Sequence, residues 1–191
     1  MSRAYRIKVK ESVARDIRAE DSIETCLEIL EILPAEQMGE LLAAELEKRG
    51  FERQEDGTLV RKEEDGVTVT VEPCSGTVTV QAETADRVEV EGTREGYGYD
   101  DVGPGRKLIE ERLGQELRGD LEKRVDQQAQ KLQTAATGKL EKELQDIQPE
   151  LREAVERVTA EALKEKAKQM GTIKDISEDA ESGSLTITVE V

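Results

Sequence analysis

Alternating apolar and polar residues open the chain and predict a β-strand. Tyr5, Ile7 and Val9 would point to one side of this strand, and the basic residues between them to the other. The denser apolar run of residues 23–32 predicts a second strand, although its glutamates would also suit a helix.

An amphipathic helix is predicted at residues 34–49. Its apolar residues recur three and four positions apart, its acidic side chains lie early and its basic side chains lie late, as the helix dipole favours. Pro34 suits the first turn of a helix, where its missing N–H costs nothing, and Gly50 suits the stop.

Short strands separated by turn dipeptides follow this helix. Asp56-Gly57, Asp65-Gly66 and Ser75-Gly76 separate segments in which valine alternates with threonine, which predicts an antiparallel meander with one dry face. The helix at 34–49 is expected to cover that face. Residues 1–95 are therefore predicted to form an α+β head.

The composition changes at Gly96. Residues 96–106 hold several glycines, a proline, and both Tyr97 and Tyr99, which predicts a loop or hinge. Aromatic residues are scarce in this chain, so two of them together in a glycine-rich segment should either pack on the head or anchor a partner protein. Both alternatives are open at this point, and we take Tyr97 and Tyr99 as candidate partner contacts.

A long helical arm is predicted at residues 107–170. Its apolar stripe advances mostly in steps of four, which is too wide for a left-handed coiled coil. Helix-breaking residues lie at 134–138 and at Pro149. We expect a helical hairpin with its turn near 134–138, and a turn at Gln148-Pro149 is the alternative. The stripe would then be the seam between two arms or a partner-binding face.

Two further strands joined by a turn-rich segment are predicted at residues 171–191. A lone two-stranded hairpin is marginally stable in water, so this hairpin is expected to return to the head sheet. The predicted architecture is therefore α+β: an antiparallel β-sheet head with one covering helix and a long inserted helical hairpin.

Charge and composition exclude several classes of function. The chain has 44 acidic and 28 basic residues and a formal net charge of −16, which disfavours nucleic-acid binding through a basic face. It has no histidine, so His-based catalytic triads and His-ligated zinc or haem are excluded. Its two cysteines, Cys26 and Cys74, form neither a disulfide framework nor a metal-ligand spacing. We expect no catalytic residues, no metal and no cofactor.

Phosphate binding and membrane insertion are also disfavoured. The glycine-rich stretch at 96–105 lacks the Gly-Lys-Ser/Thr ending of a nucleotide-binding loop. Acidic pairs such as Asp100-Asp101 lie in predicted turns, where carboxylates stay ionised and solvated. No stretch approaches the ~20 apolar residues of a membrane span, and the start lacks the apolar run of a signal peptide. These features predict a cytoplasmic, non-enzymatic protein.

Three stretches resemble small accessory proteins of bacterial conflict systems: MSRAYRIKVKES, LEILEILPAEQMGELLAAELEKRGFE and GVTVTVEPCSGTVTV. These are ternary systems built around an FtsH-like AAA+ protease, a MoxR-type AAA+ ATPase and a von Willebrand factor A protein. The end of the chain, MGTIKDISEDAESGSLTITVEV, is similar to the closing strand hairpin of a small family associated with such ATPases.

This resemblance implies a non-enzymatic component that works beside the ATPases, and it carries over no site residues. Our leading hypothesis is an acidic adaptor that binds a protein partner, with the AAA+ ATPase or the von Willebrand factor A protein as the implied partner. The alternative is a self-assembling structural protein, a homo-oligomer whose helical arms pair with one another. An enzyme of unknown type is a third hypothesis.

Overall fold

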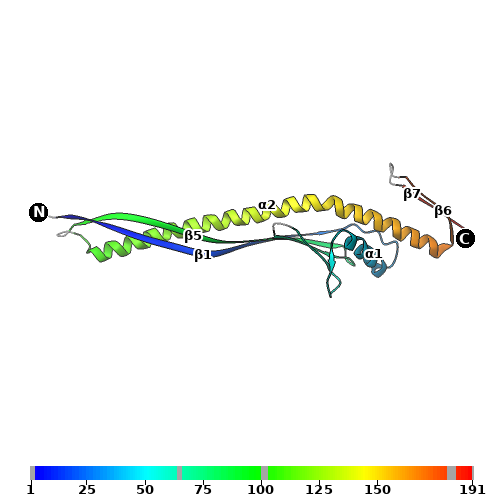
Figure 1. Ribbon diagram of the computed structural model, residues 1–191, viewed down its shortest axis with the longest axis horizontal. Coiled ribbons are helices and arrows are strands. Elements are labelled where there is room, and N and C mark those ends of the chain that lie inside the picture. The colour runs from blue at the N-terminus through cyan, green and yellow to red at the C-terminus, as the bar shows by residue number, and fades with distance from the viewer. Residues whose placement is uncertain (1–2, 64–65, 100–102, 180–183, 191) are drawn as a thin grey trace. The chain divides into compact units, whose positions relative to one another are not determined.

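The computed structural model describes residues 3–63, 66–99, 103–179 and 184–190. In chain order its elements are β1 (Ala4–Cys26), α1 (Ala35–Lys48), β2 (Glu52–Arg53), β3 (Leu59–Lys62), β4 (Val67–Glu72), β5 (Thr77–Tyr99), α2 (Arg106–Met170), β6 (Thr172–Asp179) and β7 (Ser184–Glu190) (Figure 1). Five strands form an antiparallel sheet in the order β1-β5-β4-β3-β2. The predicted α+β class, with an antiparallel sheet and a small covering helix, is confirmed.

The chain divides into two compact units. Unit 1 comprises Met1–Glu20 and Glu83–Thr137, and unit 2 comprises Asp21–Ala82 and Gly138–Val191. β1, β5 and α2 each supply residues to both units. Basic and acidic residues are nearly balanced in unit 1, whereas in unit 2 the acidic residues outnumber the basic ones about two to one. The net negative charge of the chain therefore belongs almost entirely to unit 2.

The predicted valine meander forms the sheet of unit 2. Val69 pairs with Val80 and Val71 pairs with Val78 across β4 and β5, so their side chains share one face. Gly76 turns the chain between these strands with a φ of 73°, a backbone conformation that glycine adopts without strain. The alternation of valine and threonine therefore produces one dry face, as predicted.

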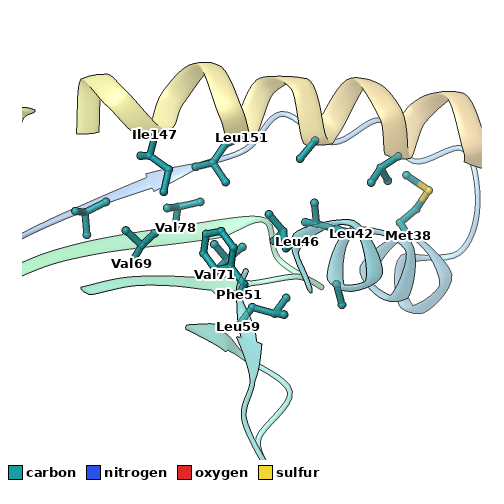
Figure 2. Packing of buried hydrophobic residues seen from close by; sticks show 14 of the residues in the cluster. Met38, Leu42, Leu46, Phe51, Leu59, Val69, Val71, Val78, Ile147 and Leu151 are labelled. Atoms are coloured by element: carbon teal, nitrogen blue, oxygen red, sulfur yellow. The ribbon is translucent and has the colours of Figure 1, made fainter. Parts of the chain in front are cut away.

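Two helices cover this valine face, and Figure 2 shows their side chains converging on it. Met38, Leu42 and Leu46 come from α1, and Ile147 and Leu151 come from α2. All five are at most 4% exposed. The core of unit 2 thus includes the long helix as well as the predicted covering helix.

β1 is much longer than the strand predicted at the start of the chain. Its alternation continues through Val13, Ile17 and Ala19, whose side chains are buried or half-buried while their neighbours are exposed. Pairing with β5 therefore extends β1 to Cys26. The strand predicted at 23–32 is wrong beyond that residue, because the apolar side chains that follow pack against the core of unit 2 without strand pairing.

α2 is one continuous helix of 65 residues, so the predicted helical hairpin is wrong (Figure 1). Neither the segment 134–138 nor Pro149 ends it. The hydroxyls of Thr134 and Thr137 donate to backbone carbonyls four residues earlier, over 3.0 and 3.1 Å, so these side chains are satisfied inside the helix.

Burial of the apolar stripe explains why the helix continues through its weakest segment. Ala136 and Leu140, on either side of Gly138, are fully buried. A glycine costs a helix only about 1 kcal/mol relative to alanine, whereas packing of an amphipathic face supplies most helical stability in proteins. The buried stripe packs on the sheet instead of forming a seam between two arms; it includes Ile109, Leu113, Leu117, Leu121 and Val125 in unit 1 and Leu140, Ile147, Leu151, Val158 and Ala162 in unit 2.

β6 and β7 pair with each other in a second, two-stranded antiparallel sheet. The expectation that they join the head sheet is therefore wrong. That expectation depended on a turn in the helical region, and α2 makes no such turn. In the described part of the chain, none of the helices combines the length and the apolar character that crossing a membrane requires.

Candidate interaction surface

In unit 1, α2 covers one face of β1 and β5, and the opposite face is exposed. Ile7 of β1 packs with Ile109 and Leu113 of α2 on the covered face. The exposed side chains come from even-numbered positions of β1 up to residue 20 and from odd-numbered positions of β5 from residue 83. We call this second surface the open face.

Glycines in β5 bring α2 and a tyrosine ring close to the strand. A Cβ at Gly96 would lie 2.7 Å from Leu113 Cδ1, and a Cβ at Gly98 would lie 2.5 Å from Cζ of the Tyr5 ring. Both distances are too short for two carbon atoms that are not bonded to each other. These positions therefore accept only glycine without movement of a neighbour, as is typical where another group approaches a strand closely.

The loop predicted at 96–106 is accordingly wrong in its first part. Gly96 and Gly98 belong to β5, which ends at Tyr99. Residues 100–102 lie outside the described residues, and α2 begins at Arg106. Glycine content indicated a flexible segment, but here glycine serves close packing within a paired strand.

Tyr97 and Tyr99 lie on the open face, with 67% and 55% of their surfaces exposed. They alternate with Gly96 and Gly98, which face α2, so the two tyrosines must face away from the helix. Among the described residues, neither ring is buried against the head, which weighs against the first of the two alternatives left by the sequence. The third tyrosine, Tyr5, packs against the cluster on the covered face.

Ion pairs flank the tyrosines on the open face. Arg6 of β1 pairs with Glu95 of β5, and Lys10 Nζ lies 2.6 Å from Glu91 Oε2. The hydrogen bond from Arg6, with its positive charge, lowers the pKa of Glu95, and the same hydrogen bond raises the pKa of Arg6. The polar groups beside the rings are therefore mutually neutralised at neutral pH.

Unit 2 contains a cluster of ion pairs to which no sequence motif pointed. Arg61 of β3 contacts Glu150 of α2 over 2.8 Å and also pairs with Glu63, while its guanidinium lies 4.6 Å from the centre of the Phe51 ring. Partial burial of Arg61 lowers its pKa, but the hydrogen bonds that its guanidinium donates to both glutamates outweigh this effect and raise the pKa overall.

Glu45 of α1 continues the same cluster and is 6% exposed. Arg49 lies 3.1 Å from Glu45 and 3.2 Å from Glu153 of α2, and Arg157 lies 3.5 Å from Glu45. Burial raises the pKa of Glu45, but hydrogen bonds from Lys48 and Arg49 outweigh it, and the pKa lies below its usual value. The α2 residues of this cluster lie about 100 residues from their partners in sequence. Only the tertiary structure therefore reveals that these charges join α1 and β3 to α2.

Both cysteines, Cys26 and Cys74, are free and exposed. No three His, Cys, Asp or Glu side chains among the described residues are grouped so that they could hold a metal ion. Of the candidate site residues expected from the sequence, Tyr97 and Tyr99 are therefore the ones that the structure exposes together on one surface.

Comparison with known proteins places the chain in a family. The family model described as FtsH ternary system domain X5 matches residues 1–191. No curated protein matches the chain, and no solved structure matches it. The resemblance to FtsH ternary systems noted from the sequence is confirmed.

Proposed function

Since the chain belongs to the FtsH ternary system domain X5 family, we propose that it is a non-enzymatic cytoplasmic adaptor that binds a protein partner through Tyr97 and Tyr99. Membership of this family implies that the chain is a component of an FtsH-containing ternary system. The partner that we propose is another component of that system, the AAA+ ATPase or the von Willebrand factor A protein implied by the sequence resemblance.

The observation that carries this proposal is the exposure of two neighbouring tyrosines on a backbone that is already held in place. β5 is paired with β1, and behind the rings Gly96 and Gly98 are in contact with Leu113 and Tyr5. Because the backbone is ordered before binding, the partner immobilises few additional degrees of freedom. Tyrosine rings offer a large apolar contact at low side-chain entropy cost.

The surroundings of the rings also suit a protein interface. Central aromatic residues surrounded by polar groups are typical of such interfaces. Here the paired Arg6 and Glu95 supply polar groups beside Tyr97. Unit 1 has nearly balanced charge, so even an acidic partner would meet little net repulsion there.

A non-enzymatic role agrees with the chemistry of the chain. It has no histidine for acid–base catalysis. The buried carboxylate Glu45 is held by Lys48 and Arg49, which favours its ionised form and makes it a poor proton donor. The apolar stripe of α2 is buried within the chain, so the self-pairing of helical arms that we considered from the sequence gains no support.

The test is a binding experiment with the purified components of the FtsH-containing system. Each component is titrated against the wild-type chain and against the double variant Tyr97→Ser/Tyr99→Ser. We expect one component to bind, and we expect the variant to lose about 2 kcal/mol of binding free energy, roughly thirtyfold in affinity, as interface anchors do. The melting temperature should be unchanged, because both rings are exposed.

Two control variants make this result specific. Thr93→Ala, on the same open face of β5, should bind like the wild type. Tyr97→Phe/Tyr99→Phe keeps the rings and should retain most of the affinity. The proposal is wrong if no component binds the wild-type chain, or if the serine variant binds as tightly as the wild type does.

A further inference from the structure

β1 forms one edge of the five-stranded sheet. Within the described chain its sole strand neighbour is β5. β1 is 23 residues long and contains no proline. A proline is one of the features that protect natural edge strands from pairing with other chains. A long edge strand of this kind presents a row of backbone donors and acceptors to another strand.

A hollow of about 540 Å³ lies along this edge in unit 1. Its lining comes from residues 8–11 of β1 and from Glu110, Glu111, Gly114, Gln115 and Arg118 of α2. No residue of β5 contributes to the lining, so the hollow lies between the edge strand β1 and α2. It offers room for the side chains of a strand added beside β1.

We propose that the added strand is β1 of a second copy of this chain, paired antiparallel about Val13. The two strands then form a continuous sheet related by a twofold axis, and every contact occurs twice. This inference is independent of the proposed adaptor function, because it uses the edge of β1 and not the tyrosines of the open face.

Charge complementarity selects this register. Arg6 faces Glu20 of the second copy, Lys10 faces Asp16, and Glu11 faces Arg15. Within each copy, ion pairs already hold these side chains to Glu95, Glu91, Arg118 and Asp126, so the contacts across the axis would be shared with these partners. Opposite charges directly across two strands stabilise their pairing. A single like-charged pair, Lys8 with Arg18, opposes these three.

The apolar side chains agree with the same register. Ile7 faces Ala19, Val9 faces Ile17, and Val13 faces its own copy, all on the side covered by α2. A slip of one residue would turn every one of these side chains to the wrong face. A slip of two residues would place Lys10 or Arg6 against Arg18, which replaces an attraction with a repulsion.

The two long helices fit the same arrangement. In unit 1, α2 contacts both strands, since Arg118 lies 3.3 Å from Glu11 of β1 and Asp120 lies 3.2 Å from Arg94 of β5. A helix above both strands lies about one strand spacing from the twofold axis, so the two helices would be roughly 10 Å apart. At that distance the two helices lie side by side without overlap, and their apolar stripes stay on the sheet.

The test is a charge swap on the full-length chain, read by analytical ultracentrifugation at low and high ionic strength. Wild type is expected to sediment as a dimer. Lys10→Asp and Asp16→Lys each create two like-charged pairs across the dimer axis and should raise the dimer dissociation constant about tenfold or more. Lys10→Asp also replaces the ion pair with Glu91 within each copy by a repulsion. An equimolar mixture of the two variants restores both attractions and should form a heterodimer.

Two controls accompany the swap. Glu89→Lys, an exposed reversal on β5 away from the edge, should leave the dimer intact, and circular dichroism should show that each variant is folded. A monomeric wild type, dimeric single variants or a mixture that stays monomeric would overturn the proposal. Tyr97→Ser/Tyr99→Ser should sediment like wild type, so failure of this inference is distinguishable from failure of the adaptor function.

Discussion

Leu113 of α2 occupies the space that a side chain at Gly96 of β5 would need, with its Cδ1 only 2.7 Å from the place of a Cβ. Leu113 is 7% exposed and packs with Ile7 and Ile109, so it has little freedom to move aside. This close approach joins the long helix to the strand that presents Tyr97 and Tyr99 on its other face.

Replacement of Gly96 by valine should therefore destabilise the chain by about 1–3 kcal/mol, the usual cost of overfilling a packed site. Urea unfolding would measure the change. Gly119→Ala is the matched control, because nothing lies within 4 Å of that position in α2. It should be neutral or stabilising by up to about 1 kcal/mol. If the valine variant is as stable as the wild type, Leu113 moves aside at little cost and the prediction is wrong.

Gly138→Ala should stabilise the chain by about 1 kcal/mol, because alanine favours a helix interior more than glycine does. No atom lies within 4 Å of a Cβ at this position, so no clash offsets the gain. The free energy of unfolding in urea measures this effect. A loss of stability would indicate that the chain turns at this glycine instead of continuing as a helix.

Arg61→Met should cost about 1–3 kcal/mol, because it leaves partly buried Glu150 and Glu63 without their cation and removes the contact with Phe51. Arg53→Met is the control, since Arg53 pairs with the exposed carboxylates Glu40 and Glu47. Such exposed pairs contribute at most about 1 kcal/mol. If the two variants unfold at the same denaturant concentration, the Arg61 cluster does not stabilise unit 2.

Because of Glu45, the free energy of unfolding should decrease as the pH is lowered. Its pKa in the folded chain lies below its usual value, and the pKa of a glutamate in an unfolded chain is about 4.3. The stabilisation is therefore complete above that value and is lost as the pH falls through the lower folded pKa. Glu45→Gln should lower stability at pH 7 and flatten the decline below about pH 5, measured by thermal unfolding across this range.

Glu143 should behave in the opposite way. Burial, together with the negative charges of Glu63 and Asp146, raises its pKa. Its ionised form is therefore disfavoured in the folded chain at neutral pH, and protonation relieves this penalty as the pH falls through the raised folded pKa. Glu143→Gln should stabilise at pH 7 and have little effect below about pH 4. Identical pH profiles for the Glu45 and Glu143 variants would contradict both assignments.

The sequence by itself determined those features that depend on neighbouring residues. Alternation of valine and threonine specified the meander of unit 2, and the spacing of Met38, Leu42 and Leu46 specified α1 with its buried face. Gly50 indicated the end of this helix and Ser75-Gly76 indicated a turn between strands, and both glycines have positive φ angles in the structure. Each of these signals acts within one strand or one helical turn, so it can be recognised before any partner is known.

Tertiary structure alone decided whether locally weak segments break. Gly138 and Pro149 favour a turn, yet α2 continues because its stripe is buried on both sides of them. Gly96 and Gly98 favour a loop, yet they pair in β5 because Leu113 and Tyr5 need the space. Local preferences of about 1 kcal/mol per residue are small beside the burial of a helix face. The exposed side of Tyr97, the pairing of Arg61 with Glu150 and the separate β6–β7 sheet all depend on such distant contacts.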